Sequence, residues 1–247
     1  MTFRTIADFE ALTGDDALTE AETALIAACR AGELCVLGDG KRPETDSADR
    51  RIRATLLRLL IVGGSDSCDL ADRGVNLWGG WIDGELNLDF ATGRGFTILV
   101  HCHFTHQPQM NATKLGSLNL SGSKLPGLFA QGIKVAEDVF LHADFHATGT
   151  VDLSGADIGG QLDCTKGRFD GNGEMALNGQ KAKVAGGFFW QNVTIDNGTV
   201  DLNGAHVGDH VDDLGSWPKG ANSLDLDGFT YDRIASLTDT KQRLEWL

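Results

Sequence analysis

The sequence has no long hydrophobic run. Its longest apolar stretch, around residues 56–62, is far shorter than the roughly 20 residues that a membrane-spanning helix needs. The opening residues, MTFRTIADFEALTGDD, contain no apolar segment of the kind that signal peptides carry. Within these 247 residues we therefore expect neither a membrane span nor a secretion signal.

Cysteine pairs are also lacking. The chain has five cysteines, an odd number, and none of them stands in a C-x-x-C motif: Cys29, Cys35, Cys68, Cys102 and Cys164. Free, structural thiols are typical of a reducing compartment, so the location that we expect is the cytoplasm.

Positive charge is scarce. Lys and Arg together number 21 against 35 Asp and Glu, which gives a net charge of −14. Because a phosphate backbone is bound through a basic stripe, direct binding of nucleic acid is not expected. The acidity keeps the protein soluble or, alternatively, mimics a polyanion such as DNA.

What the sequence does contain is an internal repeat. VDLSGADIGGQLDC from Val151 and VDLNGAHVGDHVDD from Val200 match at their apolar, glycine and small positions, 49 residues apart. Earlier copies begin at Val75 and Leu118. A unit of this kind cannot bury its apolar face alone and must stack on the next copy, as in a solenoid.

Residues 75–232 divide further into five-residue words such as VNLWG, LNLSG and VDLSG. Each word has Leu, Ile or Val at its centre, a small or aliphatic residue two positions earlier, and usually Gly at its end. Such a word forms one side of a square coil, with both aliphatic side chains inward and glycine at the corner. We therefore expect four representative central residues to face the lumen: Leu120, Leu153, Ile158 and Leu202.

These words resemble those of the pentapeptide-repeat family over roughly residues 75–232. The resemblance implies an all-β fold, a right-handed quadrilateral parallel β-helix with about four words per coil and about eight coils here. Aromatic residues replace the usual Leu at Phe140, Phe145 and Trp190, and loops at 169–176 and 216–223 interrupt the five-residue count.

A narrower resemblance covers the whole chain. RRIRATLLRLLI, GVNLWGGWIDGELNL and the final RLEWL are similar to segments of uncharacterised bacterial proteins that are loosely labelled membrane-associated oxidoreductases. In those relatives the solenoid resembles a cytoplasmic head, so a membrane contact is expected only through a region absent from this chain. The sequence contains no G-x-G-x-x-G fingerprint and no metal motif, so we assign no cofactor and do not favour an enzyme.

Sequence patterns predict helices at both ends of the chain. Residues 1–64 are expected to form a helical N-terminal cap, in which the capping-box pair Thr19 and Glu22 starts a helix that ends at Gly32. A second amphipathic helix is expected over Ala48–Ile61. Residues 233–247 predict a short C-terminal capping helix that docks through Trp246 and Leu247.

Three histidines are weak candidates for a metal site: His101, His103 and His142. Aligning the copies places His142 in the column of His101 and Asp144 in the column of His103, about two coils or roughly 9–10 Å away. Zinc needs three or four ligands that converge at about 2.0–2.3 Å. We therefore expect surface or groove histidines and assign no metal ligand and no catalytic residue.

A second polar group lies near the C-terminal coils. His206 takes an outward position in its word, and His210 follows it. Asp213 aligns with Cys164, so an apolar column is expected to become charged there. Asp212 and Asp213 are neighbours on a strand and face opposite sides, which argues against a catalytic carboxylate pair.

Partner contacts are expected at Trp78 and Trp81, as an aromatic patch near the first coils, and at Arg50 and Arg51. The leading hypothesis for function is a non-catalytic protein-interaction scaffold, because a rod with flat sides offers surface rather than a cleft. One alternative is a DNA mimic that acts on a topoisomerase. Another is a metal-dependent enzyme that uses the His101/His103 region. The partner and the oligomeric state are left open.

Overall fold

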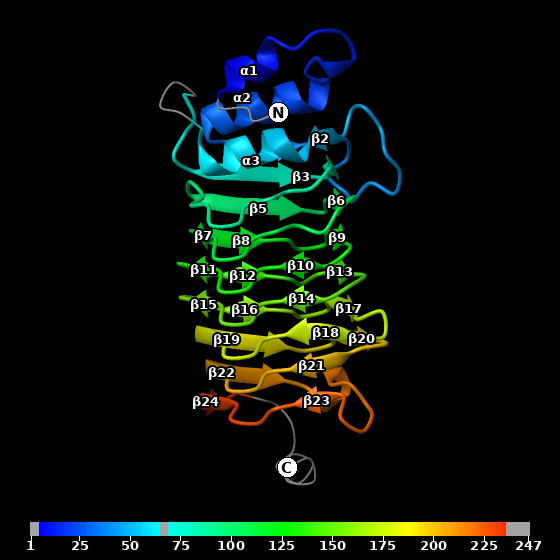
Figure 1. The fold of residues 1–247 in the computed structure, drawn as a ribbon, viewed down its shortest axis with the longest axis vertical. Helices are drawn as coiled ribbons and strands as arrows, with labels where there is room; N and C mark the ends of the chain where they lie inside the picture. Colours follow the sequence, from blue (N-terminus) through cyan, green and yellow to red (C-terminus); the bar gives the residue numbers. More distant parts are fainter. Residues whose placement is uncertain (1–4, 65–68, 236–247) are drawn as a thin grey trace.

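The structure is a computed structural model that describes residues 5–64 and 69–235. The chain winds into a parallel β-solenoid of about seven turns, with short helices at its N-terminal end (Figure 1). The expected fold class, an all-β solenoid with a small helical cap, is confirmed. The number of turns is about seven rather than eight, because loops lengthen several turns beyond four five-residue words.

Each regular turn has four strands and therefore four sides. In the turn that starts at Val151, these strands are β14 (Val151–Asp152), β15 (Asp157–Ile158), β16 (Leu162–Asp163) and β17 (Arg168–Asp170). The next turn begins at β18 (Met175–Asn178), which pairs with β14. We number the sides 1 to 4 in this order.

Side 1 is a five-stranded sheet. Its strands are β10 (Leu128–Phe129), β14, β18, β21 (Thr199–Asp201) and β23 (Leu224–Asp225). Side 4 is a seven-stranded sheet. Its strands are β2 (Arg51–Arg53), β4 (Trp81–Asp83), β6 (His103–Phe104), β9 (Lys124–Leu125), β13 (His146–Ala147), β17 and β20 (Thr194–Asp196).

Sides 2 and 3 belong to one twelve-stranded sheet, because the long strands β19 (Lys183–Trp190) and β22 (His206–Asp212) continue around the corner between them. Side 2 also contains β7 (Lys114–Leu115), β11 (Lys134–Val135) and β15. Side 3 contains β1 (Cys35–Val36), β3 (Gly74–Trp78), β5 (Phe96–Val100), β8 (Ser117–Asn119), β12 (Val139–Phe140) and β16. The last strand is β24 (Thr230–Ile234), which pairs with β22.

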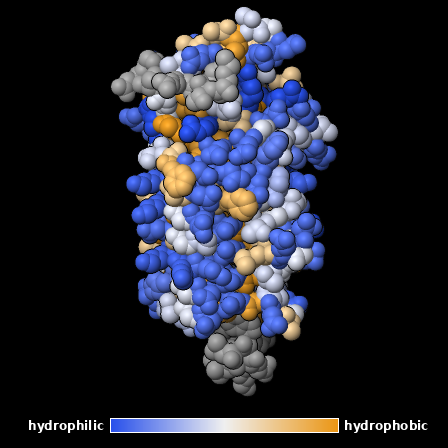
Figure 2. Space-filling view, viewed as in Figure 1, coloured by the Kyte–Doolittle hydropathy of each residue, from blue (hydrophilic) through white to orange (hydrophobic). Residues whose placement is uncertain are grey.

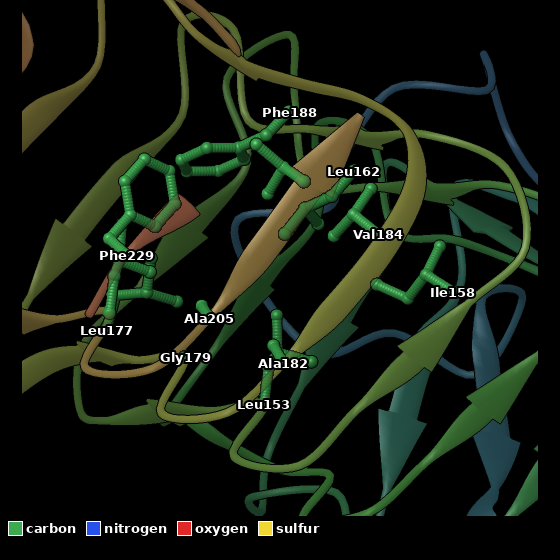
Figure 3. Close-up of a pocket in the computed structure, with 12 residues that line it drawn as sticks. Leu153, Ile158, Leu162, Leu177, Gly179, Ala182, Val184, Phe188, Ala205 and Phe229 are labelled. Atoms are coloured by element: carbon green, nitrogen blue, oxygen red, sulfur yellow. The ribbon is translucent and has the colours of Figure 1, made fainter. Parts of the chain in front are cut away.

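Stacked side chains fill the lumen. All four representative residues are buried, as expected: Leu120, Leu153, Ile158 and Leu202. Near the C-terminal end, aliphatic side chains from several turns meet the rings of Phe188 and Phe229 (Figure 3). The space left among them is about 20 Å³, so the lumen is a packed core and not a channel.

Aspartate and asparagine side chains close many corners. Oδ1 of Asp152 accepts a hydrogen bond from the backbone N–H of Ser154 at 2.9 Å, two residues later in the chain. The same contact recurs at Asn119, Asp163, Asn178, Asp201 and Asp225. Part of the acidity of the chain therefore serves to form turns.

The 49-residue repeat corresponds to two turns. Val151 pairs with Leu177, and Leu177 pairs with Val200. The intervening turn carries the same aliphatic positions but a less regular sequence. Because this turn lies between them, the two best-matching copies do not contact each other directly.

The N-terminal helices are α1 (Ile6–Glu10), α2 (Glu20–Ala31) and α3 (Ala54–Val62), with a 3-10 turn at Gly14–Asp16 and another near the C-terminal end at Leu214–Ser216. The expected capping box is present, since Thr19 Oγ1 accepts from the Glu22 N–H at 3.1 Å and the Glu22 carboxylate accepts from the Thr19 N–H at 3.2 Å. Gly32 ends α2 in the left-handed conformation, as predicted.

The helix expected over 48–61 begins only at Ala54. Residues 51–53 form β2 instead, because they pair in register with β4. Likewise β1 pairs with β3, so the residues before Gly64 supply strands as well as helices. At the other end Arg233 and Ile234 belong to β24, and residues 236–247 of the expected C-terminal helix, with Trp246 and Leu247, lie outside the described residues.

Candidate interaction surface

Four large apolar side chains lie exposed at the first turns of side 3. Val36 of β1 and Trp78 of β3 are paired in register, and they are 50% and 38% exposed. Leu34, just before β1, is 44% exposed, and Phe96 at the start of β5 is 41% exposed. We call these four residues the N-terminal patch. Such a group of exposed apolar residues contrasts with the mostly hydrophilic surface over the turns (Figure 2).

The indole of Trp78 contacts the ring of a histidine. The ring of His101 meets it edge-on, with 6.1 Å between ring centroids. Nδ1 of His101 in turn lies 3.0 Å from the carbonyl oxygen of Gly40. His101 therefore links Trp78 to the loop that follows β1.

A groove of about 510 Å³ runs along the edge of the patch between Leu34 and Phe96. Oδ1 of Asn76, one of its lining residues, is buried and has no hydrogen-bond partner among the described residues. Arg73 lies at the rim, where its guanidinium donates to the Gly32 carbonyl at 3.3 Å. The groove thus offers a polar atom and apolar walls side by side.

Trp81 lies on a different side of the solenoid. It belongs to β4 on side 4, where its ring stacks on His103 with 4.0 Å between centroids and 4° between planes. The corner between the two tryptophans is Gly79-Gly80, and a Cβ on Gly79 would stand 2.7 Å from the Leu37 carbonyl oxygen. Trp78 and Trp81 therefore do not form one patch.

Arg50 and Arg51 anchor the loop between β1 and β2. Arg50 forms an ion pair with Asp39 at 3.0 Å and donates to the Lys41 carbonyl at 3.0 Å. Arg51 pairs with Asp46. The pKa of Asp39 is lowered, first by the Lys41 N–H and then by Arg50. Both arginines, which were expected to contact a partner, are thus engaged in contacts within this loop.

The candidate metal residues do not converge. The backbone N–H of His101 donates to the Ser121 carbonyl, and the backbone N–H of Gly122 donates to the His142 carbonyl. The two histidines are therefore two turns apart, as the repeats suggested. His103 pairs with Lys124, and Lys124 pairs with His146. The expectation that Asp144 shares the column of His103 is therefore wrong: Asp144 sits in a corner with φ of 68°. Within residues 5–64 and 69–235, no group of three or more His, Cys, Asp and Glu side chains is placed to hold a metal ion.

Two polar residues enter the lumen near its C-terminal end. His210 and Asp212 are buried, with Nε2 of His210 3.4 Å from Oδ2 of Asp212. The indole N–H of Trp217 donates to the same carboxylate oxygen at 2.8 Å. Nδ1 of His210 is buried without a hydrogen-bond partner in the described part of the chain.

The residue that shares the column of Cys164 is Asp212, not Asp213 as the repeat alignment predicted. Cys164 stacks on Trp190, which pairs with Asp212. The alignment fails by one position because the register between β19 and β22 shifts after Val184. Asp213 instead accepts from the Asn192 N–H and the Ser216 hydroxyl in the following loop. His206 is exposed, as predicted from its outward position.

From the sequence we did not expect Leu34, Val36 or Phe96 at this surface. A signal for Phe96 was available in FTILV, since strand alternation places Phe96 and Ile98 opposite to the buried Thr97 and Leu99. Leu34 and Val36 gave no such signal, because β1 is only two residues long.

Among residues 5–64 and 69–235, none of the helices combines the length and the hydrophobicity that a membrane span requires. Comparison with protein-family profiles, with curated proteins and with solved structures finds no match for this chain.

Proposed function

We propose that this protein is a non-catalytic scaffold that binds another protein through the N-terminal patch. The observation that carries the proposal is the exposure of four large apolar residues on the first turns of side 3, where Val36 lies beside Trp78 and Phe96 lies at the other end of the β3–β5 pair. Protein interfaces have aromatic and aliphatic residues at their centre and polar residues around them. The groove beside the patch, with Arg73 and Glu33 on its wall, supplies a polar rim of this kind.

The interior of the solenoid supports binding rather than catalysis. Sites for small molecules are usually cavities of about 300–1,000 Å³ that enclose their ligand. The lumen near Phe188 and Phe229 leaves only about 20 Å³. The volume available for recognition therefore lies on the outer surface, where the groove beside the patch is about 510 Å³.

The family and the location belong to the same proposal. The five-residue words and the four-sided turns support placing the chain with pentapeptide-repeat proteins. Four cysteines are buried and free, which supports a reducing location such as the cytoplasm.

Site-specific crosslinking tests the proposal. A photoreactive amino acid at position 36 should capture one partner in cells, and the same residue at position 157 on side 2 should not. The purified partner should then bind the wild type more tightly than the Phe96→Ser/Trp78→Ser variant. Phe129→Ser is the matched control, because Phe129 is 39% exposed but lies on side 1. Equal affinity of the wild type and the double variant would remove the patch from the proposal.

Mimicry of DNA is a second candidate, favoured by one observation on side 1. Asp152, Asn178, Asp201 and Asp225 follow one another in register and form a partly acidic column. A supercoiling assay with DNA gyrase tests this candidate. Inhibition by the wild type that is lost in Asp201→Asn/Asp225→Asn would support mimicry, and absence of inhibition would exclude gyrase as the target.

A further inference from the structure

Side 4 carries an outward column of cationic and aromatic side chains, although the net charge of the chain is −14. The register aligns, one turn after another, Arg51, Trp81, His103, Lys124, His146 and Arg168. None of these six positions holds a carboxylate. Since adjacent strands lie about 4.8 Å apart, successive side chains of the column are neighbours.

The charge at the centre of this column is not compensated. At the two ends, Arg51 pairs with Asp46 and Arg168 pairs with Asp196. Lys124 lies half-buried between His103 and His146 and forms no ion pair with a described carboxylate.

A second cation reaches the same place from a distant part of the sequence. Arg42 lies in the loop between β1 and β2, which projects beside the first turns (Figure 1). Its Nη1 donates to the carbonyl oxygens of Gly122 at 2.8 Å and of Asp144 at 3.0 Å. These residues precede β9 and β13, so the guanidinium is held beside Lys124 without a carboxylate partner among the described residues.

The nearby positive charges contribute to a lowered pKa in both histidines. Desolvation lowers the pKa of His103, and the nearby Lys124 and Arg42 lower it further. Desolvation also lowers the pKa of His146. Its other neighbours are Arg168, Lys124 and Arg42, which lower the pKa, and Asp196, which raises it. The neutral form of each ring, which carries one N–H donor, is therefore favoured.

We propose that Lys124, Arg42, His103 and His146 form a binding site on side 4 for an oxyanion, the shared chemistry of a carboxylate and a phosphate group. Lysine and arginine supply charge-assisted hydrogen bonds, and the imidazoles add neutral donors on either side. Stacking on Trp81 fixes the ring plane of His103. The site lies on a different side from the N-terminal patch and does not depend on the scaffold proposal.

Titration of the histidine rings by NMR tests the site with sulfate, which keeps two negative charges over the range in which histidine titrates. The signals of His103 and His146 are assigned from His103→Gln and His146→Gln. In the wild type, sulfate at constant ionic strength should raise the pKa of both rings in a saturable way, relative to chloride. Unchanged pKa values of both rings would overturn the proposal.

Two variants show whether the cations carry the effect. Lys124→Gln should weaken sulfate binding about tenfold, the loss expected for one charge-assisted hydrogen bond. Lys134→Gln removes the same charge from β11 on side 2 and should leave the affinity unchanged. If Lys124→Gln melts at a lower temperature than the wild type, the sulfate affinity of Arg42→Gln provides the second measurement. Sulfate affinity equal to that of the wild type in both Lys124→Gln and Arg42→Gln would overturn the proposal.

Succinate in place of sulfate distinguishes the two sources of the oxyanion. Tighter binding of succinate would assign the site to a carboxylate, and tighter binding of sulfate would assign it to a phosphate-like group. Failure of both to shift the two histidines would overturn the proposal, and this result would leave the crosslinking test of the N-terminal patch unaffected.

Discussion

Arg53 and Glu22 join the helical cap to the first turn of the solenoid. Nη2 of Arg53 lies 2.6 Å from Oε2 of Glu22, and Nε lies 2.8 Å from Oε1. The backbone N–H of Arg53 donates to Oε1 at 3.0 Å. Glu22 also accepts from Thr19 at the start of α2, so one buried carboxylate holds both a helix terminus and a strand.

Glu22→Ala should lower the free energy of unfolding by about 3–5 kcal/mol, because it leaves the partly buried Arg53 guanidinium and two backbone N–H groups without their acceptor. Urea denaturation followed by circular dichroism measures the change. Glu20→Ala, at an exposed position two residues earlier on α2, is the control and should change stability by no more than about 0.5 kcal/mol. Similar losses in both variants would contradict this role of Glu22.

Gly122→Ala should be more destabilising than Gly155→Ala. Both glycines have φ near 65°, a conformation that costs an L-residue about 1–2 kcal/mol. A Cβ on Gly155 meets nothing within 4 Å, whereas a Cβ on Gly122 would stand 2.0 Å from Cδ2 of His101. Thermal denaturation of both variants, with His101→Ala as the relieving partner in a double-mutant cycle, measures the difference. The idea fails if His101→Ala does not reduce the excess loss.

Thr97→Val should stabilise the protein by about 1 kcal/mol. Thr97 lies in the inward column between Val75 and Leu118, and its buried Oγ1 has no hydrogen-bond partner among the described residues. Thr113→Val is the matched control, because the equally buried hydroxyl of Thr113 donates to the Leu88 carbonyl at 2.7 Å. It should destabilise by about 0.5–1.5 kcal/mol. Urea denaturation measures both changes. A loss of stability in Thr97→Val would show that the hydroxyl of Thr97 has a hydrogen-bond partner.

The described thiols should resist alkylation in the native protein. Burial raises the pKa of Cys29 and of Cys102 to about 12 and that of Cys35 to about 11, with Cys35 adding to the shift at Cys29. Burial also raises the pKa of Cys164 well above the ordinary value. Since the thiolate is the reactive form, a Cys68→Ser protein at pH 8 should incorporate no label before unfolding and four labels in urea. Rapid native labelling would contradict the burial of these groups.

The same shifts predict that stability falls in alkali. A thiol whose pKa is raised in the folded state contributes fully below the unfolded value near 9.0, and this contribution is lost as pH rises toward the folded value. Between pH 9 and 11 each such thiol should lower the free energy of unfolding by up to about 1.4 kcal/mol per pH unit. Cys102→Ala should show a shallower decline than the wild type in urea denaturation at pH 8, 9 and 10. Parallel declines would remove Cys102 as a cause.

Much of the fold could be predicted because its cause is local. A central Leu and an aliphatic residue two positions earlier point to the same face of an extended chain, and four corners close the coil. The burial of Leu153 and Ile158 was predicted correctly in this way, and the capping box at Thr19 was also predicted correctly from the local sequence. It failed at the start of α3, since pairing of Arg51–Arg53 with β4 outweighed the helical pattern of that segment.

The candidate surfaces were less accessible to prediction because they depend on which residues meet across turns. Trp78 was identified, but its neighbour Val36 is 42 positions earlier. A loop, β2 and α3 lie between them, so no local sequence pattern relates the two residues. Lys124 falls between His103 and His146 only because the intervening turns have the lengths that they do. A one-residue shift after Val184 similarly put Asp212, rather than Asp213, into the lumen.

The sequence by itself determined that the chain coils and which side chains fill the coil, because burial of alternating aliphatic residues is a short-range property of each word. The tertiary structure alone decided the outer surface: that Trp78 meets Val36, and that Arg42 arrives beside Lys124. Those contacts depend on the number of residues in every turn and loop between the partners, and small insertions change that number without changing the words.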